Sequence, residues 1–376
     1  MLRADVFCRV IDNYGDIGVT YRLIRQLCRE HDWSIRLWVD QLASFKKLEP
    51  LVDYRVARQS INGIDVIRWD DRAPDLDPAD VTIASFSCDL PASYLAKLHA
   101  SKSLWINLDY LSAEDWVEGC HGLPSLRSDG LSSYFFFPGF TEKTGGLIRE
   151  ENLISQRDHW WTDRNEQFNL LCALGIDQNT SLAWRDQTAN QPFIVSLFCY
   201  PQANVTGLIN ALATRTQPSL LLVPDGVATH LQSGRQGQCQ IHRIPFVTQP
   251  DYDKILWTAD LNFVRGEDSL VRAIWAGKPM IWQIYPQDEG THFIKLDAWI
   301  KKVTPGDRVT ELLRAWNGHG DAAELEESVN LALSPESFAR WRKAMFEFCT
   351  QQTRTPDLAS ALIKFCELSA STSQKG

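Results

Sequence analysis

Two carboxylates four residues apart stand in a glycine-bearing loop near the start of the chain. The loop reads DNYGDIG at residues 12–18, directly after an apolar run at 6–10. Asp12 and Asp16 could act as a general base and its helper, or could hold a cationic group. Alternatively, Asp12 starts a turn and Asp16 caps the helix that follows. The two acids and the missing G-x-G-x-x-G pattern argue against a nucleotide phosphate bound by this loop.

A second candidate site is the charged turn RGEDS at residues 265–269, between an apolar run and a helical run. The exposed backbone N–H groups at a helix N-terminus favour an anion such as a phosphate, and Arg265 adds a fixed positive charge. The alternative is ordinary capping, in which Asp268 or Ser269 satisfies the first turn of the helix.

Aromatic and polar side chains follow two other apolar runs in the second half of the chain. Phe198 and Tyr200 come after the run at 193–198, and Phe246 and Gln249 come after the run at 240–244. A ring beside a phosphate-binding helix end can stack on a nucleobase or a sugar. Alternatively, these rings fill the edge of a core.

The elements that must position these residues alternate between strand and helix. In the first half we predict strands at 6–10, 34–39, 81–86 and 104–108, with helices at 19–30, 42–48 and 91–99. A second series has strands at 193–198, 220–223, 240–244 and around 261–264, and helices at 203–214 and 251–258. This alternation predicts an α/β fold of two tandem Rossmann-like domains. A helical tail follows residue 305.

The sequence turns polar at 156–191, and we expect the domain junction to lie within this stretch. We therefore predict an N-terminal domain at 1–180, joined by a C-terminal helix at about 350–370, and a C-terminal domain at 190–345. A chain of 376 residues is also long for a single core.

Composition excludes several classes of protein. The net charge is −9 without a basic run, which argues against nucleic acid as a partner. Neither an apolar stretch of membrane-spanning length nor a signal-peptide pattern is present. The nine scattered cysteines form no C-x-x-C pair, so we expect reduced thiols, a cytoplasmic protein and no structural zinc. The motifs of serine hydrolases, zincins and P-loop proteins are also missing.

Several long blocks carry a resemblance to a known family. The blocks read VIDNYGDIGVTYRL, NLDYLSAEDWVEGCHGLPS, YFFFPGFTEKTGGLIRE, SLFCYP and DLNFVRGEDSLVRAIWAGKPMIWQIYPQ. They resemble the bacterial protein-arginine rhamnosyltransferases that modify elongation factor P, the EarP family of glycosyltransferase type B (GT-B). The resemblance extends from about residue 9 to about residue 287 and so spans both predicted domains.

The resemblance implies a GT-B architecture with a central cleft, an acceptor domain at the N-terminus and a nucleotide-sugar domain after it. It implies an inverting transfer of L-rhamnose from dTDP-β-L-rhamnose to one arginine of translation elongation factor P. The modification would activate that factor for the rescue of ribosomes stalled at polyproline. No metal and no other cofactor, nucleic acid or membrane is expected.

The resemblance also implies a role for each candidate residue. Asp16 would be the general base, Asp12 would orient the acceptor guanidinium, and Glu267 is included among the catalytic residues. The donor would be bound by Asn13, Tyr14, Gly15, Phe198, Tyr200, Phe246, Gln249, Arg265, Gly266, Glu267, Asp268 and Ser269. Within this set, Phe198, Tyr200 and Phe246 would surround the thymine with Gln249 nearby. Residues 265–269 would hold the ribose and the diphosphate.

Two other functions compete with this prediction. One is a GT-B glycosyltransferase with a different acceptor, such as a lipid or a glycan. The other is a non-catalytic protein that binds a nucleotide-sugar or a translation factor. Pro201, where the family would more often have an acidic residue, departs from the pattern at the rim of the donor site.

Overall fold

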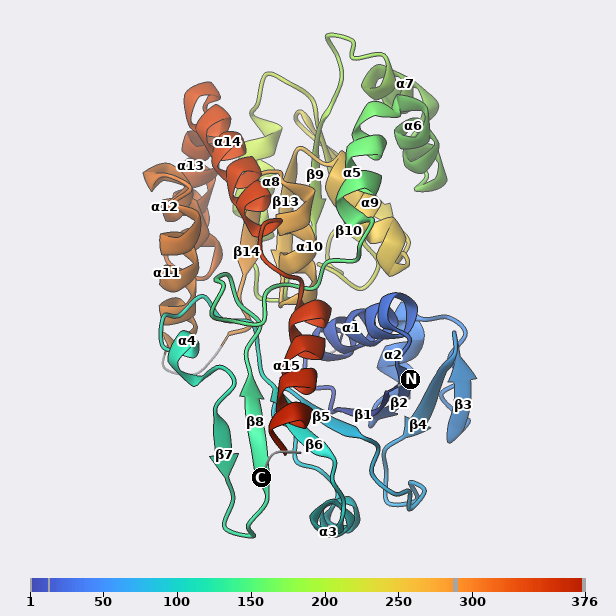
Figure 1. Ribbon diagram of the computed structural model, residues 1–376. Coiled ribbons are helices and arrows are strands. Elements are labelled where there is room, and N and C mark those ends of the chain that lie inside the picture. Colours follow the sequence, from blue (N-terminus) through green and yellow to red (C-terminus); the bar gives the residue numbers. More distant parts are fainter. Residues whose placement is uncertain (1, 13, 287–289, 374–376) are drawn as a thin grey trace. The chain divides into compact units, whose positions relative to one another are not determined.

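Apolar runs alternate with helical runs along the chain, and in the computed structural model the apolar runs become the strands of two separate sheets (Figure 1). The structure describes residues 2–12, 14–286 and 290–373. The chain divides into two compact units, one made of Met1–Glu151 with Gln352–Gly376 and the other of Asn152–Gln351. The α/β fold predicted from the sequence is confirmed.

The sheet of the first unit is mostly parallel. Its strand order is β3 (Arg58–Ile61), β4 (Ile64–Arg68), β2 (Ser34–Val39), β1 (Arg3–Cys8), β5 (Val81–Ser85), β6 (Leu104–Leu108), β8 (Ser132–Phe136) and β7 (Pro124–Leu126). The outermost pairs, β3–β4 and β7–β8, are antiparallel. The central strands are covered on both faces, which explains why they read as continuous apolar runs.

Helices cover both faces of this sheet. One face packs against α1 (Gly15–His31), α2 (Leu42–Leu48) and α15 (Leu358–Ser373), which contribute Leu27, Phe45 and Leu362 to one core cluster. The other face packs against α3 (Ala92–Ala100) through Tyr94 and Leu98. A short helix, α4 (Val117–Cys120), precedes β7.

The sheet of the second unit has the order β11 (Gly234–Gln236), β12 (Cys239–Ile244), β10 (Ser219–Pro224), β9 (Phe193–Leu197), β13 (Leu261–Arg265) and β14 (Met280–Gln283). All neighbours are parallel except β11 and β12. The helices are α5 (Leu153–Thr162), α6 (Arg164–Ala173), α7 (Gln178–Arg185), α8 (Val205–Ala213), α9 (Gln249–Thr258), α10 (Asp268–Ala276), α11 (His292–Val303), α12 (Asp307–Trp316), α13 (Ala322–Ala332) and α14 (Pro335–Gln352).

The sequence predicts a polar domain junction within 156–191, but the structure has helices there. This segment forms α6, α7 and most of α5, and it belongs to the second unit. Leu171 and Trp184 are buried in a core cluster with residues of β9 and β10. A few large apolar anchors therefore fix these helices although most of their residues are polar.

The strand order reverses beside one strand in each unit. In the first unit β1 lies between β2 and β5, and in the second unit β9 lies between β10 and β13. Ligands of open α/β sheets bind at the carboxyl ends of the strands at such a switch point. The topology therefore singles out the loops after β1 and β5, and the loops after β9 and β13.

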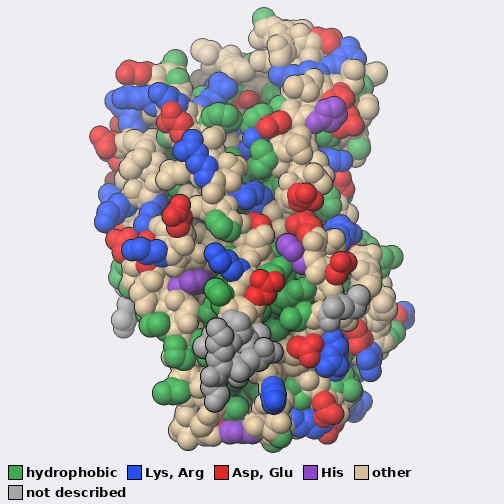
Figure 2. Space-filling view, in the orientation of Figure 1, with side chains coloured by type: hydrophobic (Ala, Val, Ile, Leu, Met, Phe, Trp, Pro, Cys, Tyr) green, Lys and Arg blue, Asp and Glu red, His purple; other side chains and the backbone are tan. Residues whose placement is uncertain are grey.

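On the visible face of the molecule, Lys and Arg side chains are interspersed with Asp and Glu (Figure 2). Within the described residues, none of the helices combines the length and the apolar character that crossing a membrane requires.

Candidate active-site residues in the two units

Asp16 is the second residue of α1, next to the loop that precedes the helix. The helix begins at Gly15, earlier than the predicted residue 19, because the loop turns directly into it. The Asp16 side chain is 2% exposed. Its Oδ2 accepts hydrogen bonds from the backbone N–H groups of Ile11 (2.7 Å) and Asp12 (2.9 Å). Asp16 therefore binds the loop that precedes α1 and does not cap the helix, whereas Asp12 does start a turn, as the alternative prediction had it.

The surroundings of Asp16 perturb its acidity. Burial raises the pKa of the Asp16 carboxyl, and the nearby charge of Asp12 acts in the same direction. The backbone N–H groups of Asp12 and Ile11 oppose this by stabilising the carboxylate. Two backbone donors hold Oδ2, whereas Oδ1 has the Tyr110 hydroxyl at 3.5 Å. The Asp16 carboxylate is therefore held mainly through Oδ2.

Asp12 is held in the same loop by a hydrogen bond of its backbone carbonyl. Its carbonyl accepts a 2.6 Å hydrogen bond from the Gly15 N–H. A Cβ atom at Gly15 would lie 2.9 Å from the Asp12 Oδ2, so a side chain there would push the carboxylate away. The Tyr14 hydroxyl accepts from Lys47 at 3.0 Å. Asn13, predicted to contact the donor, lies outside the described residues.

Residues that were not predicted lie in the loops after β5 and β6 of the first unit. Tyr110 follows β6, and its ring stacks on Phe86 with the centroids 4.5 Å apart. Phe86 and Ser87, directly after β5, have φ angles of 57° and 51°. Consecutive non-glycine residues in this region are uncommon, and such strained backbone clusters at functional sites. Their position after strands at the carboxyl edge was the available signal.

In the second unit, the Arg265 side chain is held between two rings. Its guanidinium carbon lies 4.7 Å from the centroid of Phe198 and 4.6 Å from that of Tyr200. The rings come from the loop after β9, and Arg265 is the last residue of β13, so the switch point brings these three predicted residues together. The rings fix the direction of the cation without neutralising its charge.

The turn after β13 is closed by its own residues. Gly266 has a φ of 60°, a conformation that favours glycine. The Ser269 hydroxyl bonds to the backbone carbonyl of Arg265 and accepts from the Arg265 N–H. Glu267 is the N-cap residue of α10 and makes no side-chain capping bond. The turn therefore presents the first residues of α10 on a fixed backbone.

Gln249 joins this group through Asp268. Its Nε2 donates to the Asp268 Oδ2 at 3.1 Å, and the Gln249 side chain is buried at the start of α9. Phe246 is half-buried in the segment between β12 and α9. All predicted donor residues outside the loop at 13–15 therefore lie in the second unit, at loops that follow β9, β12 and β13.

Three supporting residues in the second unit were not predicted. The Gln283 side chain, at the end of β14, accepts from the Tyr200 N–H at 2.7 Å. Arg272 of α10 and Asp253 of α9 form a buried ion pair at 2.6 Å. Gln283 stands at the carboxyl end of a strand and could have been found by that rule. The ion pair joins two helices, and sequence spacing gives no signal for it.

The described residues contain no group of three or more His, Cys, Asp or Glu side chains that could hold a metal ion. Arg265 and the start of α10 are the positive groups that the switch point of the second unit offers to an anionic ligand.

Comparison with known proteins gives consistent matches over the whole chain. Residues 4–367 match the profile of the family described as elongation factor P (EF-P) rhamnosyltransferase EarP. The chain is 42% identical to the protein-arginine rhamnosyltransferase of Pseudomonas putida, over 96% of this chain and 97% of that protein. The corresponding protein of Pseudomonas aeruginosa is 41% identical, over 96% and 98%.

Solved structures extend this similarity to the fold. One, described as the structural basis for EarP-mediated arginine glycosylation of translation elongation factor EF-P, has a TM-score of 0.66 and 29% identity, over 98% of this chain and 100% of that one. The spinosyn rhamnosyltransferase SpnG has a TM-score of 0.58, over 97% of this chain and 100% of that one. At 11% identity, the second structure supports the fold alone.

Proposed function

Because this chain belongs to the EarP family of elongation factor P rhamnosyltransferases, we propose that it transfers L-rhamnose from dTDP-β-L-rhamnose to one arginine of elongation factor P. The family and the fold make the chain a glycosyltransferase. The donor nucleotide, the inversion at the sugar and the roles of single residues are the parts that we propose. The modified factor would then serve ribosomes stalled at polyproline.

One observation carries this proposal. The two strand-order reversals of the chain hold complementary chemistry: a buried carboxylate after β1, and an arginine held between rings after β9 and β13. The first suits a cationic acceptor, and the second suits an anionic, ring-bearing donor. We therefore assign the acceptor to the first unit and the nucleotide-sugar to the second.

The carboxylates of the first unit supply what an arginine acceptor needs. A guanidinium has a pKa above about 12 and is a poor nucleophile while its charge is delocalised. We assign Asp12 to attract and orient it, and Asp16 to accept its proton. The buried, backbone-held Asp16 supports this assignment because burial brings its pKa closer to the operating pH.

The second unit supplies the groups for the donor. We assign Phe198, Tyr200 and Phe246 to the thymine, with Gln249 at its edge. Arg265, Gly266, Asp268 and Ser269 hold the diphosphate and ribose, and Glu267 is assigned to the ribose hydroxyls because its charge disfavours a phosphate. The loop residues Asn13, Tyr14 and Gly15 complete the proposed donor contacts.

The transfer is a single displacement. A guanidino nitrogen forms the bond to the anomeric carbon while the bond from that carbon to the diphosphate oxygen breaks. The nitrogen's proton passes to Asp16, and the electron pair leaves with dTDP. Arg265 and the N-terminus of α10 stabilise the charge that develops on the leaving group, without a metal ion. Attack from the face opposite the leaving group inverts the anomeric centre.

The test is a reaction of the full chain with elongation factor P and dTDP-β-L-rhamnose, read by intact mass and then by fragmentation. We expect an increase equal to one deoxyhexose residue on one arginine. An omitted-donor reaction and the Asp16→Asn variant are the controls. A factor that stays unmodified, while a glycan or lipid acceptor is glycosylated, would replace this proposal with the alternative acceptor. Donor binding without transfer to any acceptor would support the non-catalytic alternative.

A further inference from the structure

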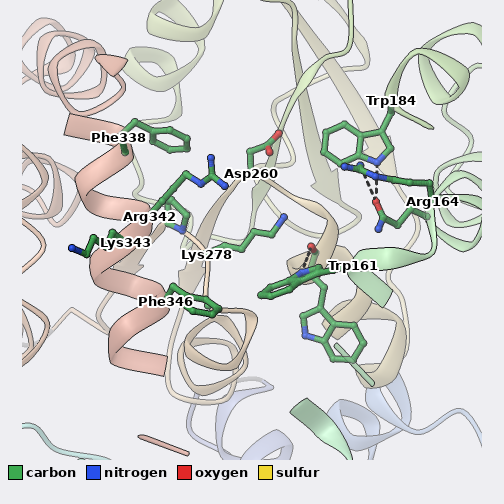
Figure 3. Close-up of a pocket in the computed structure, with 14 residues that line it drawn as sticks. Trp161, Arg164, Trp184, Asp260, Lys278, Phe338, Arg342, Lys343 and Phe346 are labelled. Atoms are coloured by element: carbon green, nitrogen blue, oxygen red, sulfur yellow. Dashed lines mark hydrogen bonds between the residues drawn. The ribbon is translucent and has the colours of Figure 1, made fainter. Parts of the chain in front are cut away.

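The second unit contains a cavity of about 660 Å³, and Figure 3 shows the side chains that line it. Asp260 immediately precedes β13 and Lys278 stands two residues before β14, so the cavity that they line lies at the amino ends of these strands. Arg265 is the last residue of β13. The five residues of this strand place the Arg265 turn roughly 17 Å from the cavity. The cavity is therefore distinct from the proposed donor site.

Positive side chains from three elements converge on this cavity. Lys278 reaches its middle, Arg342 of α14 faces it from one wall, and Arg164 of α6 faces it from the other (Figure 3). Asp260 is the acidic residue among the lining side chains. The lining is thus positively charged in a chain whose net charge is −9.

The surroundings of Lys278 disfavour its charged form. Burial lowers its pKa to about 8, Asp260 opposes this shift, and Arg342 and Arg164 add to it. Within the described part of the chain, the Lys278 ammonium makes no hydrogen bond or ion pair, and its contact is with the ring of Trp161 at 6.0 Å. The carboxylate of Asp260 accepts from the Ile194 N–H at 2.9 Å and so is held by the backbone. Among the described residues that line the cavity, Asp260 is thus the one carboxylate that offsets three neighbouring positive charges, and a bound anion would offset them further.

Aromatic rings form much of the remaining wall. The Trp161 ring contacts the Lys278 ammonium. The guanidinium carbon of Arg164 lies 5.3 Å from the ring centroid of Trp184. Flat rings beside fixed cations suit a ligand that is planar at one end and anionic at the other. A volume of this size falls within the range of small-molecule sites. With Lys343, four cationic side chains and one carboxylate of the described chain line the cavity, which matches a multiply charged phosphate better than a single carboxylate.

We propose that this cavity binds a second ligand, a phosphorylated molecule with a planar ring, which is the chemistry of a nucleotide. The inference stands on the cavity and its side chains and does not depend on the proposed function. A second nucleotide site in the unit assigned to the donor would let the supply of another nucleotide influence transfer.

The test uses ADP as the probe, with the full chain in an isothermal titration. All cavity variants are made in a protein that also carries Arg265→Ala, so that ADP binding at the proposed donor site is weakened. We expect ADP to bind the Arg265→Ala protein as it binds the wild type, and Lys278→Met or Arg342→Ala to weaken binding about tenfold or more. Adenosine and inorganic pyrophosphate, which carry only the ring or only the charge, should each bind more weakly than ADP.

Arg340→Ala is the matched control, because Arg340 is an exposed arginine on the same helix that does not line the cavity. It should leave ADP binding unchanged. Arg342→Ala changes an exposed position on α14, so it tests the proposal even if the Lys278 variant does not fold. Absence of ADP binding in the Arg265→Ala background, or equal binding by the Arg342 and Arg340 variants, would overturn the proposal.

Discussion

At the scale of single residues, the proposed chemistry depends on Asp16, a carboxylate that is buried and held by backbone donors. We expect Asp16→Asn to lower the rate of transfer by at least about 100-fold, because the proposed general base is lost. The affinity for dTDP-β-L-rhamnose should remain, since the proposed donor groups are almost all elsewhere. The measurement is single-turnover kinetics with a parallel calorimetric titration of the donor. Normal turnover by this variant would disprove the assignment of Asp16.

The same substitution should not lower the stability of the protein. The folded-state pKa of Asp16 is raised by burial, so the ionised form opposes folding at neutral pH, and this cost disappears as the pH falls through the raised pKa. An asparagine oxygen can still accept the N–H groups of Ile11 and Asp12. We therefore expect a thermal midpoint at pH 7 equal to or above that of the wild type. A clear drop would mean that the charge itself stabilises the loop.

Lowering the pH, which should remove the stability cost of ionised Asp16, should by contrast reduce the activity. The base must be ionised, so kcat/KM should fall as the pH falls through the pKa of Asp16. Because burial raises that pKa, the acidic limb should lie above the usual range of an aspartate. Asp12→Asn removes a neighbouring negative charge that raises this pKa, so the limb should move to lower pH. A limb that stays in place would indicate that another group titrates.

The proposed donor groups give a separate prediction. Arg265→Ala should weaken donor binding by about tenfold or more, because a charge-assisted contact to the diphosphate is lost. Phe246→Ala should have an effect of similar size through lost stacking on the base. Arg340→Ala, a change of an exposed arginine in the same unit, is the control. Unchanged affinity in a calorimetric titration of both donor-site variants would refute the proposed pocket.

Some residues of the candidate site could be predicted, and others could not. Asp12, Asp16 and Arg265 stand out because charged residues after apolar strands are conspicuous in sequence. Gln283 ends a strand and Tyr110 follows one, so the strand-end rule includes them, but the rule does not rank them above other polar and aromatic residues at strand ends. The Asp253–Arg272 pair joins two helices, and its formation depends on packing that no local pattern encodes.

At the scale of elements, local periodicity predicts the buried strands best. The strand at 34–39 and the helix at 42–48 have the predicted bounds. The β3–β4 hairpin was missed, although Asn62 and Gly63, with φ angles of 51° and 81°, form its turn. An Asn-Gly pair between short strands is a recognised hairpin signal. The helices at 153–185 were missed because burial of a few anchors, such as Trp184, outweighs their polar composition.

The ion pair between α9 and α10 gives a prediction at this scale. The Asp253 and Arg272 side chains are almost fully buried, so removing one partner leaves an uncompensated charge in the core. We expect Arg272→Met to lower the free energy of unfolding by about 3–5 kcal/mol. Replacing both partners with apolar residues should cost less. Arg314→Met, at an exposed ion pair on α12, should change stability by less than about 1 kcal/mol in denaturant titrations.

At the scale of the whole molecule, the chain leaves the first unit after residue 151 and returns to it at residue 352. The returning helix α15 is part of the core of the first unit, because Leu358, Ala359 and Leu362 are fully buried among residues of its sheet and α1. The Gly146 backbone is packed against the carbonyl of Pro356, so close that a Cβ atom there would lie 2.2 Å from that oxygen. The first unit is thus completed by a segment that follows the whole of the second unit in the chain.

This path predicts where a core substitution in α15 acts. Leu362→Ala should lower the free energy of unfolding by about 2–5 kcal/mol through lost burial and a cavity. In hydrogen exchange, the loss of protection should concentrate in residues 2–151 and 358–369. Leu325→Ala, an equally buried change in α13, should instead reduce protection in the second unit. If both variants lowered protection equally in both units, the chain would unfold as one cooperative body, and the two cores would not be independent.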